Sequence, residues 1–514
     1  MSATAVAEPR TKMSAEAITH VDVLIAGAGI SGIGSACHLK IQCPGKTFAV
    51  IESKDTFGGT WETHKYPGVR SDSDLYTFGY RFKPWVGAPI ASAEEILKYM
   101  GEVIEKQGIR EQIHFGHRIT SCSWSSKDNL WTVETARTDG TSVTFTANYL
   151  WMCQGYYNHE TPYLPEWAGV ADYQGQFVHA MKWDPATDYT GKKIIVIGSG
   201  ATAATVIPAM ADKAAKVTML QRSPTYFFAA PNVNELADKL RAGGIDEPTI
   251  HRVVRTQIMY DQNLLDKRCG DEPEAVVAEL HEAIKAYGGE DFQFEPHFTP
   301  NYRIWQQRLA FVPNGDLFTA IAAGKVDVVT DTIDRFTAKG ILTSSGQELE
   351  ADIIVAATGF RLSVMGDIPF SVDGTAVNWG DTVNYRGMMF TGVPNMCWVF
   401  GYFRASWTLR VDMQADFICG LLNEMSARGA KRIDVALRDE DHNMAIRPWI
   451  EEDNFNPGYL MRGIDQLPRS GDKHEWRHSQ DYWTEVREIP YIDLTGSEFL
   501  YDGARSTKRV TEAA

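Results

Sequence analysis

Three glycines after a short apolar run are the first feature of the sequence that could bind a ligand. The segment VDVLIAGAGISGIG has the spacing G-x-G-x-x-G at Gly27, Gly29 and Gly32, between a strand-like and a helix-like stretch. Such a loop lets the backbone approach a pyrophosphate, whose charge the start of the helix attracts. The next apolar run, TFAVIE, ends in Glu52, about 20 residues beyond the last glycine, where a carboxylate can bind ribose hydroxyls. The segment therefore predicts a dinucleotide site.

A second loop of this kind follows later in the chain. The segment KKIIVIGSGATAATVIPAMA carries Gly198, Gly200 and Ala203, and the next strand-like run ends in Gln221 and Arg222 instead of an acid. A guanidinium attracts the 2′-phosphate of NADPH, which a carboxylate would repel. The simpler interpretation of Arg222, a solvated charge at a strand end, is less favoured because of its position opposite the expected ribose. Two such units predict FAD in the first and NADPH in the second, in a flavin enzyme reduced by NADPH.

Composition excludes several other classes. The 514 residues are 44% hydrophobic and 23% charged, as in ordinary globular domains. The formal charge of −16 argues against a nucleic-acid partner, and no apolar window of about 18 residues predicts a membrane span. Seven scattered cysteines form no C-x-x-C pair, which disfavours a disulfide reductase and a zinc site, so no metal is expected. Residues 1–20 lack the features of a signal or transit peptide, and we expect a cytoplasmic protein.

Three further strings narrow the reaction: GTWETHKYPGVRSD (59–72), YQGQFVHAMKWD (173–184) and DIIVAATG (352–359). Together they resemble the type I Baeyer–Villiger monooxygenases, single-chain FAD enzymes that use NADPH and O2. The family fingerprint is matched, with Tyr in place of the commoner Phe, by Tyr173, Gly175, His179, Trp183 and Asp184. The second family pattern is matched by Gly59, Trp61, Tyr66, Pro67, Gly68 and Asp72. Strings such as YPGVRSDSDLYT and QRLAFVPNGDLF resemble the ethionamide-activating subgroup more closely.

The resemblance implies a set of binding residues. The FAD-binding residues are expected to be Gly27, Gly29, Ser31, Gly32, Glu52, Thr60, Trp61, Asp72 and Ile119. The NADP-binding residues are expected to be Arg70, Ser71, Asp72, Gly198, Ser199, Gly200, Ala201, Thr202, Ala203, Gln221 and Arg222.

The resemblance also places the catalytic cation at Arg308, with Asp72 as its partner. A fixed guanidinium stabilises the anion of a peroxyflavin and the adduct that it forms with a ketone. The abundance of arginine alone would favour an ordinary ion pair, and the motif match favours the catalytic role. Many family members carry Lys directly before this Arg, where the chain has Gln307. If that Lys helps to hold the 2′-phosphate, this chain relies more on Arg222 to bind the phosphate, and its preference for NADPH over NADH would be weaker.

Other motif residues receive structural roles. Imidazole titrates near neutrality, but a hydrogen-bonded structural histidine is at least as reasonable for His179, which we assign no proton transfer. Trp183 and Asp184 are predicted to anchor a linker that, by resemblance, couples movement of the NADPH domain to the cycle. Phe403 and Trp407 are predicted to line the substrate pocket, at the start of a helix with Ser406 as its N-cap.

The predicted fold is α/β, with two Rossmann-like dinucleotide-binding domains, a discontinuous FAD domain and a helical insert in the NADPH domain. A mobile tail (1–19) is expected to precede the first segment of the FAD domain (20–155). The linker and the first segment of the NADPH domain (156–228), the helical insert (229–299) and the second NADPH segment (300–354) follow. The second FAD segment, with a C-terminal wrap, completes the chain (355–514). The insert either caps the substrate entrance or serves only in packing.

The predicted function is NADPH-dependent Baeyer–Villiger oxidation of a small-molecule ketone by O2 through a peroxyflavin, giving an ester or lactone, with sulfides as further acceptors. Two alternatives stay open. One is a flavin monooxygenase that oxidises nitrogen or sulfur and leaves ketones alone, and the other is a nucleotide-binding redox sensor without turnover. Asp184 and the pair of Asp72 with Arg308 favour the Baeyer–Villiger reaction.

Overall fold

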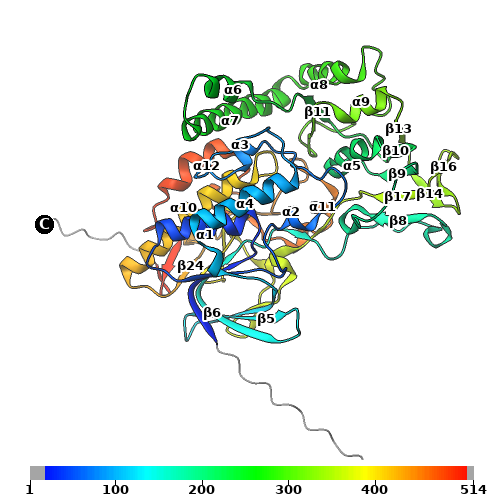
Figure 1. Cartoon of the computed structure of the whole chain (residues 1–514). Coiled ribbons are helices and arrows are strands. Elements are labelled where there is room, and N and C mark those ends of the chain that lie inside the picture. The colour runs from blue at the N-terminus through cyan, green and yellow to red at the C-terminus, as the bar shows by residue number, and fades with distance from the viewer. Residues whose placement is uncertain (1–17, 506–514) are drawn as a thin grey trace, which may run out of the picture.

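Two lobes, each built on its own sheet, make up the portion of the chain that the computed structural model describes, residues 18–505 (Figure 1). Residues 1–17 of the predicted tail lie outside the described residues, and strand β1 begins at Thr19. The predicted fold class of two Rossmann-like units is confirmed by these two sheets.

The first lobe contains a nine-stranded mixed sheet. Its strands run in the order β20 (Thr375–Ala376), β19 (Phe370–Val372), β4 (His117–Ser125), β5 (Leu130–Arg137), β6 (Ser142–Met152), β1 (Thr19–Ala26), β2 (Phe48–Ile51) and β3 (Ile113–His114), and β23 (Met396–Trp398) pairs with β6. Strand β1 is parallel to both β2 and β6. The carboxyl ends of these three strands therefore meet at one edge, where parallel α/β sheets bind ligands.

Helices cover this edge and one face of the sheet. The glycine loop after β1 leads into α1 (Ile30–Gln42), which packs against α10 (Trp407–Arg428) and α4 (Ala93–Gln107). Helix α4 starts with a capping box between Ser92 and Glu95. Residues after 435 also pack into the core of this lobe through α12 (Tyr482–Glu488) and β27 (Phe499–Tyr501). Two distant stretches of chain therefore build the first lobe.

The second lobe contains a parallel five-stranded sheet. Its order is β13 (Val326–Thr330), β10 (Lys216–Gln221), β9 (Lys193–Ile197), β17 (Ile353–Ala356) and β8 (Gln176–His179), with α5 (Ala201–Ala211) and α9 (Asp316–Ala322) packed beside it. A three-stranded sheet of β14 (Ile333–Phe336), β15 (Gly340–Thr343) and β16 (Glu348–Glu350) extends this lobe. Strand β17 runs two residues past the boundary predicted at 354.

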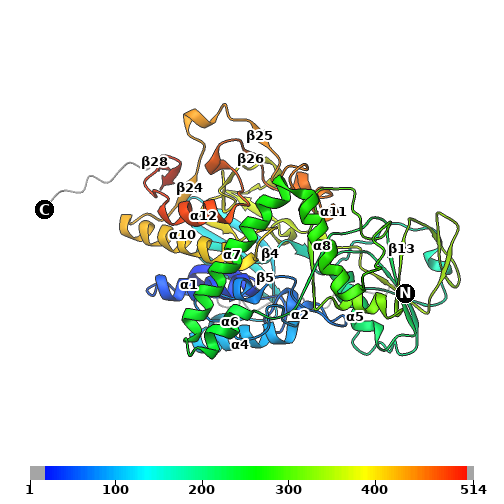
Figure 2. The same ribbon diagram turned by 90° about the horizontal axis from the view of Figure 1, so that it is seen from above.

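The insert is helical, as predicted, and contacts both lobes. It contains α6 (Glu235–Ala242), α7 (Glu247–Asp271) and α8 (Pro273–Gly288), between the paired strands β11 (Phe227–Ala230) and β12 (Ala310–Pro313). Helix α7 contacts α3 (Leu75–Phe78) of the first lobe, whereas α8 contacts α9 and β11 of the second. Figure 2 shows α7 crossing over the first lobe and α8 running from its end toward the second lobe. The insert therefore braces the lobes against each other.

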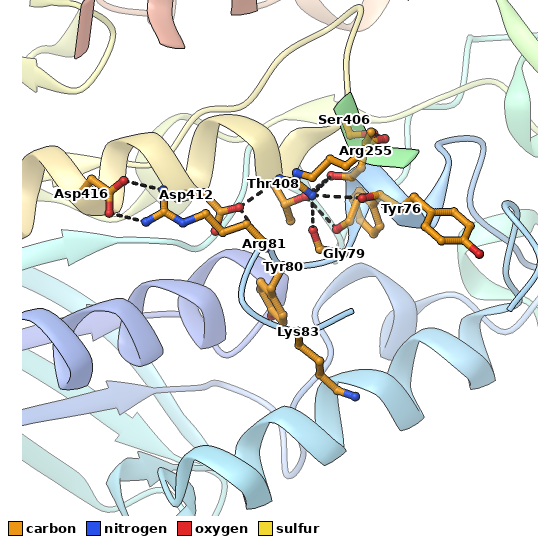
Figure 3. A network of polar contacts seen from close by, with 12 residues as sticks. Tyr76, Gly79, Tyr80, Arg81, Lys83, Arg255, Ser406, Thr408, Asp412 and Asp416 are labelled. Atoms are coloured by element: carbon orange, nitrogen blue, oxygen red, sulfur yellow. Dashed lines mark hydrogen bonds and ion pairs between the residues drawn. The ribbon is translucent and has the colours of Figure 1, made fainter. Parts of the chain in front are cut away.

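One arginine anchors α7 to the first lobe (Figure 3). The guanidinium of Arg255 donates hydrogen bonds to the carbonyl oxygens of Tyr76, Thr77 and Gly79 at 2.9 to 3.2 Å. It also pairs with the buried carboxylate of Asp412 on α10 at 3.1 Å. These carbonyls lie just after the segment that contains Asp72, so Arg255 ties the insert to the stretch that carries a predicted catalytic residue.

Replacing Arg255 should therefore destabilise the first lobe. Arg255→Met leaves the buried Asp412 carboxylate and three carbonyls without this partner, so we expect the free energy of unfolding to fall by about 3 kcal/mol. Urea unfolding of the holoprotein measures the change. Arg252→Met, an exposed arginine one turn earlier on the same helix, is the matched control and should change little. Equal stabilities of the two variants would contradict the anchoring role.

Candidate active site

A cavity of about 630 Å³ lies at the edge where β1, β2 and β6 end. Of the residues predicted to bind FAD, the cavity is lined by Gly27, Gly29, Ser31, Glu52, Thr60, Trp61, Asp72 and Ile119. Arg308, Phe403, Trp407 and Ala201, the first residue of α5, line the same cavity. The first glycine loop therefore opens into this cavity, which the start of α5, directly after the second glycine loop, also reaches.

The first loop has the geometry that its glycines predict. Gly27 has φ +100°, and a Cβ there would lie 2.9 Å from the carbonyl oxygen of Cys153. A Cβ on Gly32 would lie 1.8 Å from the carbonyl oxygen of Gly27, so α1 could not approach the loop with any larger residue. Gly29 is the N-cap of α1 and lines the cavity with Ser31. The positive end of the helix is therefore open to a phosphate.

The carboxylate of Glu52 lies beside this loop. It is buried and accepts hydrogen bonds from the backbone N–H of Ala28 at 2.8 Å and of Lys54 at 2.9 Å. These bonds fix the carboxylate at the cavity wall, where an anionic acceptor suits ribose hydroxyls. The open helix start and the fixed carboxylate together fit a dinucleotide such as FAD.

The second loop repeats the first. Gly198 has φ +134°, and a Cβ there would lie 2.5 Å from the carbonyl oxygen of Ala357. Gly200 is the N-cap of α5, and a Cβ on it would meet nothing within 4 Å, so the outer side of the loop is open. Ser199 bonds to Thr225 at 2.9 Å, and Ala203 is buried against the sheet. This loop also fits a dinucleotide phosphate.

Gln221, the last residue of β10, and Arg222, which follows it, differ in their placement. Gln221 is buried, and its amide donates to the carbonyl oxygen of His297 at 2.7 Å and to Thr330 at 2.9 Å, so this side chain braces the sheet. Arg222 is exposed and forms no ion pair within residues 18–505. Burial lowers the pKa of Arg462, and the charges of Arg222 and Arg361 lower it further. Positive charges that act on one another in this way favour an anion in their neighbourhood.

Arg308 and Asp72 form a bidentate ion pair at the cavity. Nε of Arg308 lies 2.6 Å from Oδ2 of Asp72, and Nη2 lies 2.8 Å from Oδ1. Nη1 donates to the carbonyl oxygen of Phe403 at 3.1 Å, and Nη2 contacts Ser73 Oγ at 3.4 Å. Burial alone would lower the pKa of Arg308, but Asp72 raises it above its ordinary value, so the guanidinium stays charged. One of the two Nη1 hydrogens has no partner among the described residues.

Neighbouring residues of the same motif tie the lobes together. Arg70 forms a bidentate ion pair with Asp316 at the start of α9, at 2.5 and 3.1 Å. This ion pair joins the two lobes. Ser71 is buried and donates to the carbonyl oxygen of Ser73. Trp61, on the short helix α2 (Thr60–Thr63), packs edge-on against Phe78. These contacts fix the backbone on both sides of Asp72.

The fingerprint residues lie before, in and after the edge strand β8 of the second sheet. Tyr173 is buried, and its hydroxyl donates to the carbonyl oxygen of Ala351. A Cβ on Gly175 would lie 2.2 Å from that hydroxyl, which explains the glycine. Trp183 is buried in the core of the second lobe, whereas Asp184 is exposed and accepts from the N–H of Ala186. The motif thus fixes the edge strand β8, which pairs with β17 beside the strand β9 that leads into the second glycine loop.

His179 ends β8 near a second buried histidine, His64. Its Nδ1 accepts from the N–H of Met181, and burial lowers its pKa to about 4. With His64 and Thr202 it lines a small cavity between the lobes. The ring of His64 lies 5.5 Å from that of His159, and neither nitrogen of His64 has a hydrogen-bond partner among the described residues. Burial and neighbouring positive charge lower the pKa of His64 to about 3, so it stays neutral.

The pocket residues predicted at the start of α10 are in place, with one difference. Phe403 and Trp407 line the cavity, and Trp407 Nε1 donates to Ser31 Oγ at 2.8 Å. Ser406 occupies the N-cap position, but its side chain does not cap the helix and bonds instead to Thr77 Oγ1 at 2.7 Å. The hydroxyl therefore joins α3 to α10.

An aromatic section of the cavity wall was not predicted from the sequence. Tyr156 and Tyr157, which follow Gly155 directly after β6, line the cavity together with Tyr459 and Phe455. The position of GYYN at the carboxyl end of a central strand was a signal for the first two. No comparable signal marks Tyr459 or Phe455, because they reach the cavity from about 300 residues further along the chain.

Comparisons with known proteins agree with this site. The chain is 43% identical over 472 residues to the FAD-containing monooxygenase EthA of Mycobacterium tuberculosis (strain CDC 1551 / Oshkosh), covering 91% of this chain and 95% of EthA. It is 42% identical to EthA of Mycolicibacterium smegmatis (strain ATCC 700084 / mc(2)155), covering 94% of this chain and 97% of that protein. The chain belongs to the family of FAD-containing monooxygenases. The resemblance predicted from its motifs is thereby confirmed.

Family models and solved structures extend the likeness. Residues 25–84 match the NAD(P)-binding Rossmann-like domain, and residues 93–240 match L-lysine 6-monooxygenase/L-ornithine 5-monooxygenase. The fold is that of an oxidised steroid monooxygenase bound to NADP (TM-score 0.73, 21% identity, covering 94% of this chain and 99% of that one). It is also that of the NADP+-bound cyclohexanone monooxygenase of Rhodococcus sp. Phi1 (TM-score 0.66, 23% identity, covering 82% and 87%). Within residues 18–505 this monooxygenase has no helix with the length and apolar character of a membrane span.

The buried neutral His64 should make this monooxygenase less stable in acid. Below pH 6.5 the unfolded chain binds a proton that the folded imidazole, with a pKa of about 3, does not. Between pH 7 and pH 5 the free energy of unfolding should therefore fall by about 2 kcal/mol less in His64→Phe than in the wild type. Urea unfolding at both pH values measures this, with His442→Gln, an exposed histidine, as control. The same pH dependence in His64→Phe and the wild type would contradict the burial of a neutral imidazole.

Proposed function

We propose that this flavin monooxygenase uses NADPH and O2 to insert one oxygen atom beside the carbonyl of a ketone, giving an ester or lactone, with sulfides as further acceptors. The observation that carries the proposal is the charged, bidentate pair of Arg308 with Asp72 in the cavity that the first glycine loop shares. FAD, reduced by NADPH when bound, supplies the chemistry that activates O2. The chain supplies binding, orientation and a fixed positive charge.

Each lobe is assigned one nucleotide. Residues 20–155 and 355–514 bind FAD through the first glycine loop and Glu52, and residues 156–228 and 300–354 bind NADPH through Gly198, Ser199, Gly200, Ala201 and Thr202. The exposed Arg222, with Arg361 and Arg462 nearby, offers the positive charge that a 2′-phosphate requires. Gln221 has a supporting role at this site. Its amide donates hydrogen bonds to His297 and Thr330 and thereby fixes the end of β10.

Arg308 is suited to stabilise negative charge during oxygen transfer. Asp72 holds its plane through two hydrogen bonds, and the carbonyl of Phe403 holds a third N–H. The one free Nη1 hydrogen is then available for an anionic oxygen at the cavity wall. A charge fixed in advance costs no reorganisation when the anion develops, which is the condition for strong electrostatic catalysis.

Replacing this arginine should separate the two halves of the reaction. In Arg308→Ala we expect ester formation to fall by at least about 100-fold, whereas anaerobic reduction of the flavin by NADPH persists, because hydride transfer does not require this charge. Stopped-flow absorbance and product analysis by gas chromatography measure the two steps, and Arg308→Lys should recover some of the rate. Ester formation by Arg308→Ala at the normal rate would refute the assigned role. Oxidation of sulfides or amines with no ketone oxidised by the wild type would favour the alternative flavin monooxygenase.

Arg222 should determine the choice between NADPH and NADH. Loss of its charge weakens binding of the 2′-phosphate only, so Arg222→Ala should raise KM for NADPH by about tenfold and leave KM for NADH nearly unchanged. Steady-state kinetics with both nucleotides measure the ratio. Arg335→Ala, an exposed arginine on β14 of the same lobe, is the control. Equal effects on the two nucleotides would remove the phosphate-binding role.

A further inference from the structure

Three tyrosine hydroxyls meet in the wall of the active-site cavity. Tyr156 and Tyr157 lie just after β6, and Tyr459 lies on the short helix α11 (Gly458–Met461). The hydroxyl of Tyr156 is 2.7 Å from that of Tyr157 and 3.4 Å from that of Tyr459. All three residues line the cavity together with Arg308. The proposed function assigns no role to these three hydroxyls.

Aromatic packing holds these rings in place. Tyr156 is stacked on Trp407, with centroids 5.2 Å apart and planes at 11°, and Tyr157 is stacked on Phe360 at 4.3 Å. Tyr459 meets Tyr157 edge-on at 5.4 Å. Since neighbouring rings fix each phenol, the hydroxyls are positioned before any substrate binds.

The hydrogen bonds leave one proton free to donate. Each phenol carries a single O–H, and the two hydrogen bonds that join the three hydroxyls use two of the three protons. Burial raises the pKa of all three groups, so they stay protonated. At Tyr157 the hydrogen bond with Tyr156 and the charge of Arg308 oppose this rise of the pKa. In the arrangement in which Tyr459 donates to Tyr156 and Tyr156 donates to Tyr157, the free hydrogen is that of Tyr157, which lines the cavity with Arg308.

We propose that Tyr157 donates this hydrogen bond to the carbonyl oxygen of the bound acceptor, and that the three tyrosines select flat, apolar carbonyl compounds over sulfides of the same shape. This inference rests on the proposed function of the same cavity. A carbonyl oxygen gains negative charge when a nucleophile adds to its carbon, so a hydrogen bond to it strengthens along the reaction. A sulfide has no such oxygen and gains nothing from the donor.

A binding experiment tests the donor without turnover. Oxidised holoenzyme in the absence of NADPH is titrated with acetophenone and with α-methylstyrene, which replaces the carbonyl oxygen by a methylene group, and binding is followed by flavin absorbance. The wild type should bind acetophenone about fivefold more tightly, and Tyr157→Phe should reduce this preference to less than about twofold. Tyr459→Phe, at the far end of these hydrogen bonds, should reduce it partly. Tyr491→Phe, which is 82% exposed, is the control.

The outcomes decide between this inference and the proposed function. The inference is overturned if the wild type does not bind acetophenone more tightly than α-methylstyrene. It is also overturned if Tyr157→Phe keeps the full preference of the wild type. If Tyr157→Phe does not retain flavin, the change in preference in Tyr459→Phe decides instead. If the wild type shows the preference but forms no phenyl acetate, the proposed function fails and the donor role stands.

Turnover gives a second readout. With acetophenone and thioanisole as substrates, Tyr157→Phe should lower phenyl acetate formation about tenfold more than sulfoxide formation. A structural defect would lower both rates equally, because both reactions use the same reduced flavin and oxygen. Equal losses would therefore overturn the selective role of Tyr157.

Discussion

The ion pair between Arg308 and Asp72 is the interaction on which the arrangement of the site depends. Asp72 belongs to the first lobe, and Arg308 comes from the segment that links the insert to β12. A part-buried guanidinium loses some of its hydration, and a well-placed carboxylate with further hydrogen-bond partners compensates for that loss. The bidentate contact, Phe403 and Ser73 supply those partners. The pair therefore stays charged, and Asp72 of the first lobe fixes the position of the Arg308 guanidinium at the cavity wall.

The surrounding structure can be understood as support for this pair. Arg70 with Asp316 joins the same two lobes a short distance away. Arg255 holds the carbonyls that follow the Asp72 segment, and Ser406 and Trp407 tie the start of α10 to α3 and α1. Contacts of this kind hold charged groups to within a fraction of an ångström, which electrostatic catalysis requires. The helical insert belongs to this support, since it reaches both lobes.

Local sequence patterns predicted much of the fold. Gly27, Gly32 and Gly198 are needed for backbone geometry within a few residues, so spacing alone revealed both nucleotide loops. The pairing of Arg308 with Asp72 could be expected only from the family motif, because 236 positions separate the two residues. The burial of Gln221 under His297 and the bracing role of Arg255 had no local signal. The cluster of Tyr156, Tyr157 and Tyr459 forms where two segments about 300 residues apart meet, and side-chain packing at such a meeting is set by tertiary structure.

A double-mutant cycle on the pair itself is the sharpest test of its role. Ester formation is measured for the wild type, Asp72→Asn, Arg308→Lys and the double variant, each checked for flavin content. If Asp72 acts by holding Arg308, the effects are strongly non-additive and the double variant is barely slower than the slower single variant. Additive effects on the free energy of activation would contradict the claim that the two residues form one catalytic unit.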